Sequence, residues 1–155
     1  MSKNLKIATL ILLVAVFFIF DRSLKWLFTH VWRRAEFSVI GDWLRLKPSF
    51  NQGIAFSLPA NYWLIIIFTI LIIIVLVYLS YSAYCKGKFW ELTAYTFVII
   101  GAFSNLLDRF QVGAVIDYFD VRYFTVFNLA DVYITGGLVV IVIVNLLSET
   151  LKIRD

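Results

Sequence analysis

Two aspartates, Asp117 and Asp131, are the side chains of this sequence whose type and surroundings could carry out hydrolysis. Asp117 has apolar neighbours on both sides, and Asp131 directly precedes a long apolar run. Two carboxyl groups held close together cannot both ionise easily, so they share a proton. The ionised carboxylate can take a proton from water while the protonated carboxyl donates one to an amide. The pair is therefore predicted to hydrolyse an amide bond without a covalent intermediate, with acid and base unassigned within the pair.

Other hydrolytic chemistries find less support in the sequence. There is one histidine, His30, and no His-Glu-x-x-His motif, so we expect no metal site and no cofactor. Cys85 has no histidine near it. Ser23 lies two residues from Lys25, so the two side chains point to different sides of a helix and do not form a Ser–Lys dyad.

The composition places this chemistry in a membrane. The chain has 155 residues, of which 62% are hydrophobic, 18% aromatic and 15% charged. Soluble domains are about 45–50% apolar and about 25% charged. The net charge of +4 suits contact with anionic lipid headgroups. The basic residues are scattered and the aromatic residues lie in apolar runs, so we expect membrane lipid, and no nucleic acid, as a partner.

Four apolar segments can act as membrane spans, because a helix needs roughly 20 apolar residues to cross the hydrocarbon layer. Tyr62–Cys85 contains no charged residue. Successive spans place the end of the first, the end of the third and the start of the fourth on one side, which brings Asp21, Asp108 and Asp131 to a similar depth. We expect a single membrane peptidase domain over 1–155, with spans at roughly 7–28, 62–85, 92–108 and 129–148.

The connections differ between the two sides. The side with the termini has short segments dense in lysine and arginine, which favours both termini in the cytoplasm. Lys3 and Lys6 before an apolar run also resemble a cleaved leader, but no small-x-small site follows Phe20, so a retained anchor is favoured. Trp43–Lys47 alternates apolar and basic residues after a Gly41-Asp42 turn and before Pro48, which interrupts the run. The predicted fold is an all-α membrane protein with four transmembrane helices and a small extracytoplasmic β-sheet or cradle.

Several polar residues near the spans have both a structural and a functional interpretation. Asp21 and Lys25 are spaced i, i+4, as in an ion pair at a helix end. Gly101, Asn105 and Asp108 form one helical stripe, which is also typical of close helix packing. Ionisable groups at membrane depth are costly, which favours a function for them.

The segment from Asn128 to Asp131 has the pattern of a helix start. Asn is a favourable N-cap, and an acid three residues later resembles a capping box. Both the capping interpretation and the catalytic one stay open for Asp131 at this point.

Five polar motifs, taken in order, resemble those of the lipoprotein signal peptidases, also called signal peptidase II. The motifs are Asp21-x-x-x-Lys25, Asn51-Gln52-Gly53-Ile54-Ala55-Phe56, Gly101-Ala102-x-x-Asn105-x-x-Asp108-Arg109, Val115-Ile116-Asp117 and Phe127-Asn128-Leu129-Ala130-Asp131. The resemblance covers essentially the whole chain. Leu24, Ser104 and Tyr118 depart from the residues that the family commonly has at these positions.

The resemblance implies an aspartyl endopeptidase of the bacterial inner membrane, with its active site toward the extracytoplasmic face. Its substrates would be diacylglyceryl-modified prolipoproteins, cut before the lipid-bearing cysteine, and globomycin-type peptides would inhibit it. Asp117 and Asp131 match the family's catalytic pair. Substrate-binding, inhibitor-binding and supporting positions are matched by Asn51, Gly53, Gly101, Asn105, Asp108, Arg109, Asn128, Ala130, Asp21 and Lys25.

Two alternatives accompany this interpretation. A non-enzymatic membrane protein could use the acidic cluster as a proton or ion relay, or to bind lipid. A relative of the peptidases could also have lost its substrate. We expect the peptidase to be monomeric.

Overall fold

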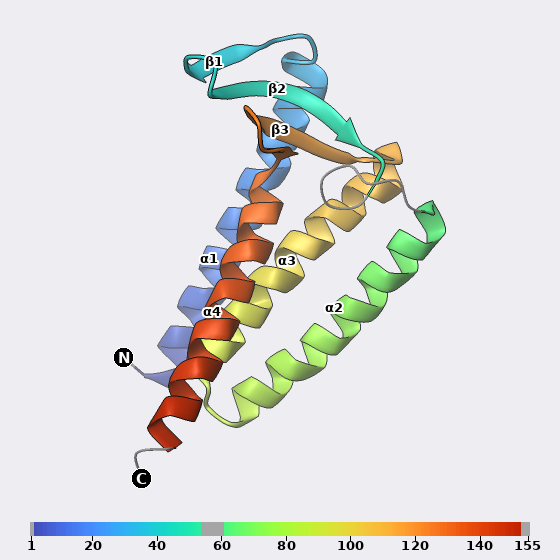
Figure 1. The fold of residues 1–155 in the computed structure, drawn as a ribbon. Coiled ribbons are helices and arrows are strands. Elements are labelled where there is room, and N and C mark those ends of the chain that lie inside the picture. The colour runs from blue at the N-terminus through green and yellow to red at the C-terminus, as the bar shows by residue number, and fades with distance from the viewer. Residues whose placement is uncertain (1, 54–60, 153–155) are drawn as a thin grey trace.

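The computed structural model describes residues 2–53 and 61–152 and consists of four long helices with a small sheet at one end (Figure 1). The helices are α1 (Lys3–Trp26), α2 (Tyr62–Cys85), α3 (Phe89–Val112) and α4 (Leu129–Lys152). Each is long and apolar enough to cross a membrane. These four helices and the sheet confirm the predicted fold class. The helices extend beyond several predicted span ends, since turns with charged residues continue the helical backbone at Lys3 and Arg109.

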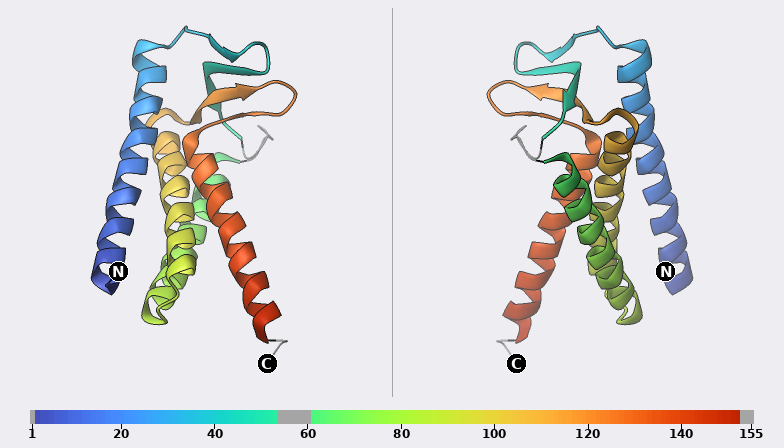
Figure 2. Two further views of the ribbon diagram at one scale, coloured as in Figure 1. Left: turned by 90° about the vertical axis from the view of Figure 1, so that its left-hand side faces the viewer. Right: turned by 90° about the vertical axis from the view of Figure 1, so that its right-hand side faces the viewer.

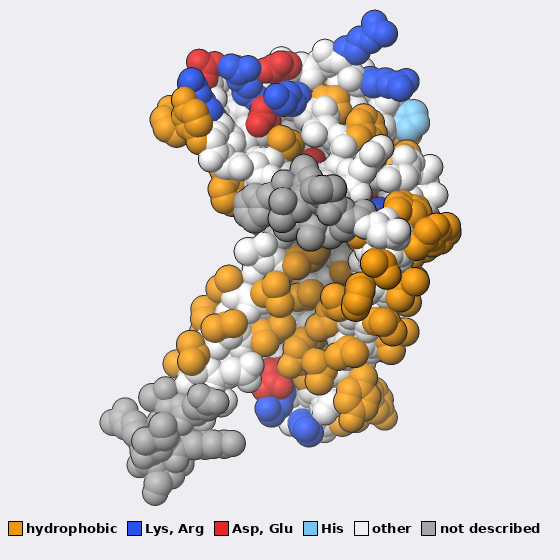
Figure 3. Space-filling model, turned by 45° about the vertical axis from the view of Figure 1, so that its right-hand side comes forward, with side chains coloured by type: hydrophobic (Ala, Val, Ile, Leu, Met, Phe, Trp, Pro, Cys, Tyr) orange, Lys and Arg blue, Asp and Glu red, His pale blue; other side chains and the backbone are white. Residues whose placement is uncertain are grey.

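The third helix lies in the centre of the bundle and packs against both α2 and α4 (Figures 1 and 2). Within its membrane-spanning window 44% of the residues are buried, against 11% for α2. This difference explains the two sequences: α2 is almost entirely apolar because lipid surrounds it, whereas α3 can carry polar groups on its buried face. Figure 3 shows the resulting belt of hydrophobic side chains, with charged groups above and below it.

An antiparallel sheet closes the end of the bundle opposite the start of α1 and the end of α4 (Figure 2). Its strands lie in the order β1 (Phe37–Ile40), β2 (Leu44–Asn51), β3 (Val115–Val121) and β4 (Val126–Phe127). The turn predicted at Gly41-Asp42 is present, and Gly41 has a φ of +48° that favours glycine.

The prediction that Pro48 interrupts the strand predicted at Trp43–Lys47 is wrong. β2 continues through Pro48 to Asn51, and its register with β3 shifts between Leu46 and Ser49. Proline lacks the backbone N–H that a regular ladder needs, so it is accommodated at this irregularity. The strand β3 was not predicted, because Val115–Tyr118 are all buried and show no alternation.

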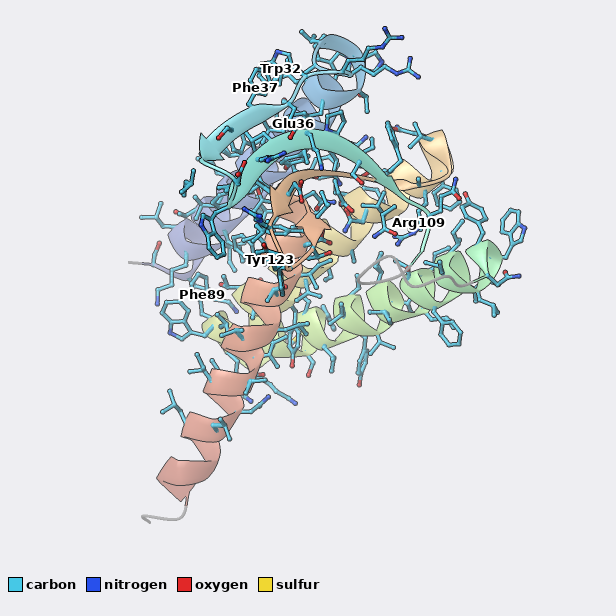
Figure 4. The ribbon with its side chains drawn as sticks, turned by 45° about the horizontal axis from the view of Figure 1, so that its top comes forward. Trp32, Glu36, Phe37, Phe89, Arg109 and Tyr123 are labelled. Carbon is cyan, nitrogen blue, oxygen red and sulfur yellow. The ribbon has the colours of Figure 1, made fainter. Side chains whose placement is uncertain are left out.

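The first helix continues into a π-helical segment, η1 (Leu27–Val31), in which the Trp32 N–H donates to the Leu27 carbonyl at 2.8 Å. This segment places Phe28 against Tyr118 of β3, with the rings stacked at 5.0 Å. Trp32 meets Phe37 of β1 edge-on at 5.4 Å (Figure 4). The aromatic contacts fix the sheet on the end of α1 and so position Asp117 relative to the helices.

Candidate active site

Asp117 and Asp131 come together through one side chain, that of Asn128. The Asn128 Nδ2 group donates to Asp117 Oδ1 at 2.7 Å. The Asn128 Oδ1 atom accepts from the Asp131 backbone N–H at 3.0 Å, and Asp131 Oδ2 accepts from the Asn128 N–H at 3.1 Å. The second exchange is a complete capping box at the start of α4. The predicted helix start is therefore confirmed. The same hydrogen bonds hold Asp131 beside Asn128, whose side chain also binds Asp117.

A second amide, Asn105 of α3, fixes the other oxygen of Asp131. Its Nδ2 group donates to Asp131 Oδ1 at 2.8 Å. Its Oδ1 atom accepts from Asn128 Nδ2 at 3.1 Å and from Lys25 Nζ at 2.8 Å. Because a lysine can only donate, this contact determines which end of the Asn105 amide faces Asp131. Both oxygens of Asp131 are thus held by hydrogen bonds from groups on different elements.

Lys25 lies at the centre of this polar network and is fully buried. Its Nζ is 2.7 Å from Asp108 Oδ2 and 3.2 Å from Asp21 Oδ2. The side chains of all three residues have 0% exposure. The Asp21–Lys25 pair is thus not the exposed helix-end ion pair that spacing alone would favour. A buried pair of this kind contributes little net stability, but loss of one partner costs about 3–5 kcal/mol.

Asp21 joins α1 to the beginning of α4. Its Oδ1 accepts from the Ala130 N–H at 3.2 Å and from the Tyr118 hydroxyl at 3.3 Å. Its Oδ2 accepts from the Ser104 hydroxyl at 2.5 Å. A carboxylate at a helix N-terminus is stabilised by the first backbone N–H groups and by the helix dipole. Asp21 therefore positions the turn that carries Asp131.

Asp108 joins α3 to the sheet in a similar way. Its Oδ2 accepts from the Ile116 N–H at 3.3 Å, one residue before Asp117. Its Oδ1 forms an ion pair with Arg22, whose second amino group donates to Gln111 at 2.9 Å. Asp108 therefore fixes the strand that carries Asp117, as Asp21 fixes the helix that carries Asp131.

Three residues of the network, Arg22, Ser104 and Tyr118, were not selected as site residues from the sequence. Ser104 and Tyr118 were noted only as departures from the family pattern, yet both bind Asp21. The Tyr118 hydroxyl also accepts from the Leu129 N–H at 3.0 Å, and its side chain has 0% exposure. No local pattern marks these three residues, because their partners in the network are distant in the sequence.

Gly101 permits the close approach of α3 and α4 beside the site. A Cβ atom at this position would lie 2.4 Å from the Ala130 carbonyl oxygen and 2.8 Å from a side-chain carbon of Ile134. Ala130 itself is completely buried. The predicted packing role of the Gly101 stripe is therefore confirmed, and it brings Asn105 within reach of Asp131.

Arg109, Asn51 and Gly53 form the side of the site next to α2. Arg109 donates to the Gly53 carbonyl at 3.2 Å, and its own carbonyl accepts from the Tyr62 hydroxyl at 2.7 Å (Figure 4). Within the described residues, the buried Arg109 Nε has no hydrogen-bond partner. The Asn51 side chain accepts from the Gly53 N–H at 2.9 Å. The rest of this predicted motif, Ile54-Ala55-Phe56, lies outside the described residues.

The environment of Asp117 favours a protonated carboxyl. Burial, followed by the charge of Asp131, raises its pKa from the ordinary value of 3.8 to about 7. Hydrogen bonds from Asn128 and Asn51 and the charge of Lys25 act against this shift. Asp117 can therefore hold a proton near neutral pH. Among residues 2–53 and 61–148, whose side chains are described, no group of three His, Cys, Asp or Glu side chains is arranged to hold a metal ion.

Sequence comparison relates the chain to proteins of one kind. Residues 13–147 match the family described as signal peptidase (SPase) II. A lipoprotein signal peptidase of Rickettsia prowazekii (strain Madrid E) is 36% identical over 131 residues, covering 79% of this chain and 68% of the relative. The lipoprotein signal peptidase of Bartonella henselae (strain ATCC 49882 / DSM 28221 / CCUG 30454 / Houston 1) is 38% identical over 135 residues, covering 83% of this chain and 82% of the relative.

Two solved structures, both described as bacterial membrane enzymes, have the same fold. One superposes with a TM-score of 0.79 at 31% identity and covers 93% of this chain and 90% of its own. The other has a TM-score of 0.77 at 30% identity and covers 90% and 94%. With a family match along most of its length, relatives above 30% identity and the same four-helix fold, the chain belongs to the signal peptidase II family.

Proposed function

We propose that this chain is an aspartyl endopeptidase that removes the signal peptide from diacylglyceryl-modified prolipoproteins and cuts before the lipid-bearing cysteine. The observation that carries the proposal is the connection of Asp117 and Asp131 through Asn128. Membership of the signal peptidase II family supports the substrate class.

In this proposal the aspartate pair shares one proton, and the raised pKa of Asp117 keeps that proton in place near neutral pH. The ionised carboxylate of the pair takes a proton from water as the water attacks the scissile carbonyl. The protonated carboxyl donates its proton to the carbonyl oxygen, which gives a tetrahedral diol. The other carboxyl then donates the proton that it took from water to the leaving nitrogen as the C–N bond breaks, and a hydroxyl of the diol returns a proton to the first carboxylate. The amides of Asn105 and Asn128 hold the carboxyl groups in their reactive orientation, so little reorganisation is needed during the reaction.

Arg109 is proposed to bind the substrate. Its buried Nε has no partner among the described residues, and an unsatisfied buried donor is costly until a ligand accepts from it. A peptide carbonyl or an oxygen of the lipid glyceryl group would satisfy it. Asn51, Gly53, Gly101 and Ala130 are proposed to shape the adjoining walls, and globomycin-type peptides are proposed to occupy the same space.

The membrane orientation is also part of the proposal. The start of α1, the α2–α3 turn and the end of α4 lie at one end of the bundle, where the connections are short and rich in lysine. The positive-inside tendency places this end in the cytoplasm and the sheet with the site on the extracytoplasmic side. We propose that the whole chain acts there as one membrane domain and as a monomer.

The test is incubation of purified protein in lipid with a prolipoprotein precursor, in its diacylglyceryl-modified and unmodified forms. Mass spectrometry of the products is expected to show cleavage before the modified cysteine only, insensitivity to chelators and inhibition by globomycin. Cleavage of neither form would contradict the proposal.

A relay would need acids distributed across the membrane depth, whereas the buried Asp21, Asp108 and Asp117 all lie at the end of the bundle that carries the sheet.

A further inference from the structure

A lipid-facing groove lies between α1 and α2, on the side of α3 away from α4. It has a volume of about 570 Å³ and an almost entirely apolar lining. The α3 residues Thr96, Ile99 and Phe103 form its floor. Gly101 faces α4 instead, and none of the proposed site residues lines the groove, so the groove is separate from the candidate active site.

The length of the groove matches one leaflet of a bilayer. On α1 its lining runs from Ile7 to Phe18. At a rise of 1.5 Å per residue this distance is about 16 Å, and half of the ~30 Å hydrocarbon layer is about 15 Å. The groove begins at the end of the bundle where α1 starts, so its depth corresponds to the leaflet on the side of the termini.

Two lysines stand at the mouth of the groove, in the turn of α1 before Ile7. Lys3 Nζ lies 4.3 Å from the ring centroid of Tyr84, which lines the groove. Lys6 Nζ lies 5.6 Å from the ring centroid of Phe89 at the start of α3, at the same end of the bundle (Figure 4). Cation–π contacts hold both ammonium groups across the mouth.

Among the side chains that the structure describes, those of residues 2–53 and 61–148, no carboxylate forms an ion pair with either of these lysines. The nearby acid, Glu91, is paired with Lys88 at 2.6 Å. The mouth therefore has an excess of positive charge directly above an apolar channel. An anionic headgroup joined to a hydrocarbon chain complements both parts.

We propose that this groove is a binding site for one anionic phospholipid of the leaflet on the side of the termini. One acyl chain lies along the channel between α1 and α2, and the phosphate lies between Lys3 and Lys6. The bound chain fills a space that the helices leave open, and so supports α1, which is 11% buried over its membrane-spanning window. This site does not depend on the proposed peptidase activity.

The test is native mass spectrometry of the purified full chain titrated with dioleoylphosphatidylglycerol or dioleoylphosphatidylcholine. We expect one phosphatidylglycerol to be retained in preference to phosphatidylcholine. The double variant Lys3→Gln/Lys6→Gln is expected to lower that affinity by about 25-fold, since each lysine contributes about fivefold. The double variant Arg33→Gln/Arg34→Gln removes the same charge from the turn after η1, at the opposite end of the bundle, and is expected to leave the affinity unchanged.

A second pair of variants tests the channel itself. Ala15→Trp places a large side chain in the groove and is expected to abolish retention, whereas Ala8→Trp, on an exposed position of α1 outside the groove, is expected to preserve it. Equal binding of both lipids, an equal effect of the arginine variant, or unchanged binding by Ala15→Trp would overturn the proposal. Loss of precursor cleavage in Ala15→Trp with phosphatidylglycerol still bound would also overturn it, and would assign the groove to the substrate's own apolar segment. Should Ala15→Trp not fold, the Lys3→Gln/Lys6→Gln variant still tests the proposal, through its affinity for phosphatidylglycerol.

Discussion

Replacing Gly101 by alanine tests how the site is positioned. The added Cβ would lie 2.4 Å from the Ala130 carbonyl oxygen, and real Cβ contacts essentially never fall below 3.0 Å. The backbone of α3 or α4 must therefore move by at least the 0.6 Å difference between these distances. Asp131 follows Ala130 directly, so this displacement reaches the proposed catalytic pair.

The expected change in stability on Gly101→Ala follows from two opposing effects. Overpacking costs about 1–3 kcal/mol, whereas Gly→Ala in a helix interior gains about 0.5–1 kcal/mol. A net loss of about 1–2 kcal/mol in stability is expected for Gly101→Ala. Because a misplacement of about 1 Å can cost about 100-fold in rate, a shift of this size is expected to lower cleavage by about tenfold.

The two glycines of α4 provide matched controls. A Cβ at Gly137 would lie 2.7 Å from the Ala94 carbonyl oxygen, deeper in the same helix pair, whereas a Cβ at Gly136 meets nothing within 4 Å. Thermal unfolding in detergent, followed by tryptophan fluorescence, is expected to show destabilisation by Gly137→Ala and slight stabilisation by Gly136→Ala. Wild-type stability and cleavage in Gly101→Ala would refute the packing argument.

Three further perturbations probe the network and its charge. Lys25→Met leaves buried acids without their lysine and is expected to cost about 3–5 kcal/mol in unfolding free energy. Its control, Lys47→Met in an exposed pair, is expected to cost less than about 1 kcal/mol. Equal losses would contradict the buried network. Tyr118→Phe removes the hydroxyl that binds Asp21 and is expected to cost about 1 kcal/mol in the same measurement, and no loss would argue against that bond. Since the folded pKa of Asp117 is raised from 3.8 to about 7, stability is expected to fall as pH rises from about 4 to about 7, and cleavage to fall above about 7. Asp117→Asn should flatten this stability profile, and an unchanged profile would contradict the assignment.

The parts of the fold that the sequence predicts are those set by local pattern. Tyr62–Cys85 carries no charged residue over 24 residues, and most of its side chains are not buried by the protein, so its length and composition already predict a membrane span. The Asn128–Asp131 helix start depends on contacts within four residues, so it is visible in the sequence. Gly41 likewise marks a turn whose backbone favours glycine.

The parts of the fold that the sequence does not predict depend on partners that are distant along the chain. Val115–Tyr118 is buried on both faces and lacks the alternation of a half-exposed strand. Tyr118 binds Asp21, which is 97 positions away, and Ser104 binds the same carboxylate from 83 positions away. No spacing rule connects such residues, and whether a polar group is buried becomes visible only when the helices and the sheet are assembled.

In the proposed mechanism, the two carboxyl groups of Asp117 and Asp131 activate one water molecule. The most direct measurement is the single-turnover cleavage rate of a diacylglyceryl-modified precursor by Asp117→Asn and Asp131→Asn, each compared with the wild type at equal thermal stability. Asparagine keeps the size and the hydrogen-bonding oxygen of each side chain but cannot exchange the proton. Each variant is expected to bind the precursor and to lose at least about 100-fold in rate. Near wild-type cleavage by either folded variant would contradict this mechanism.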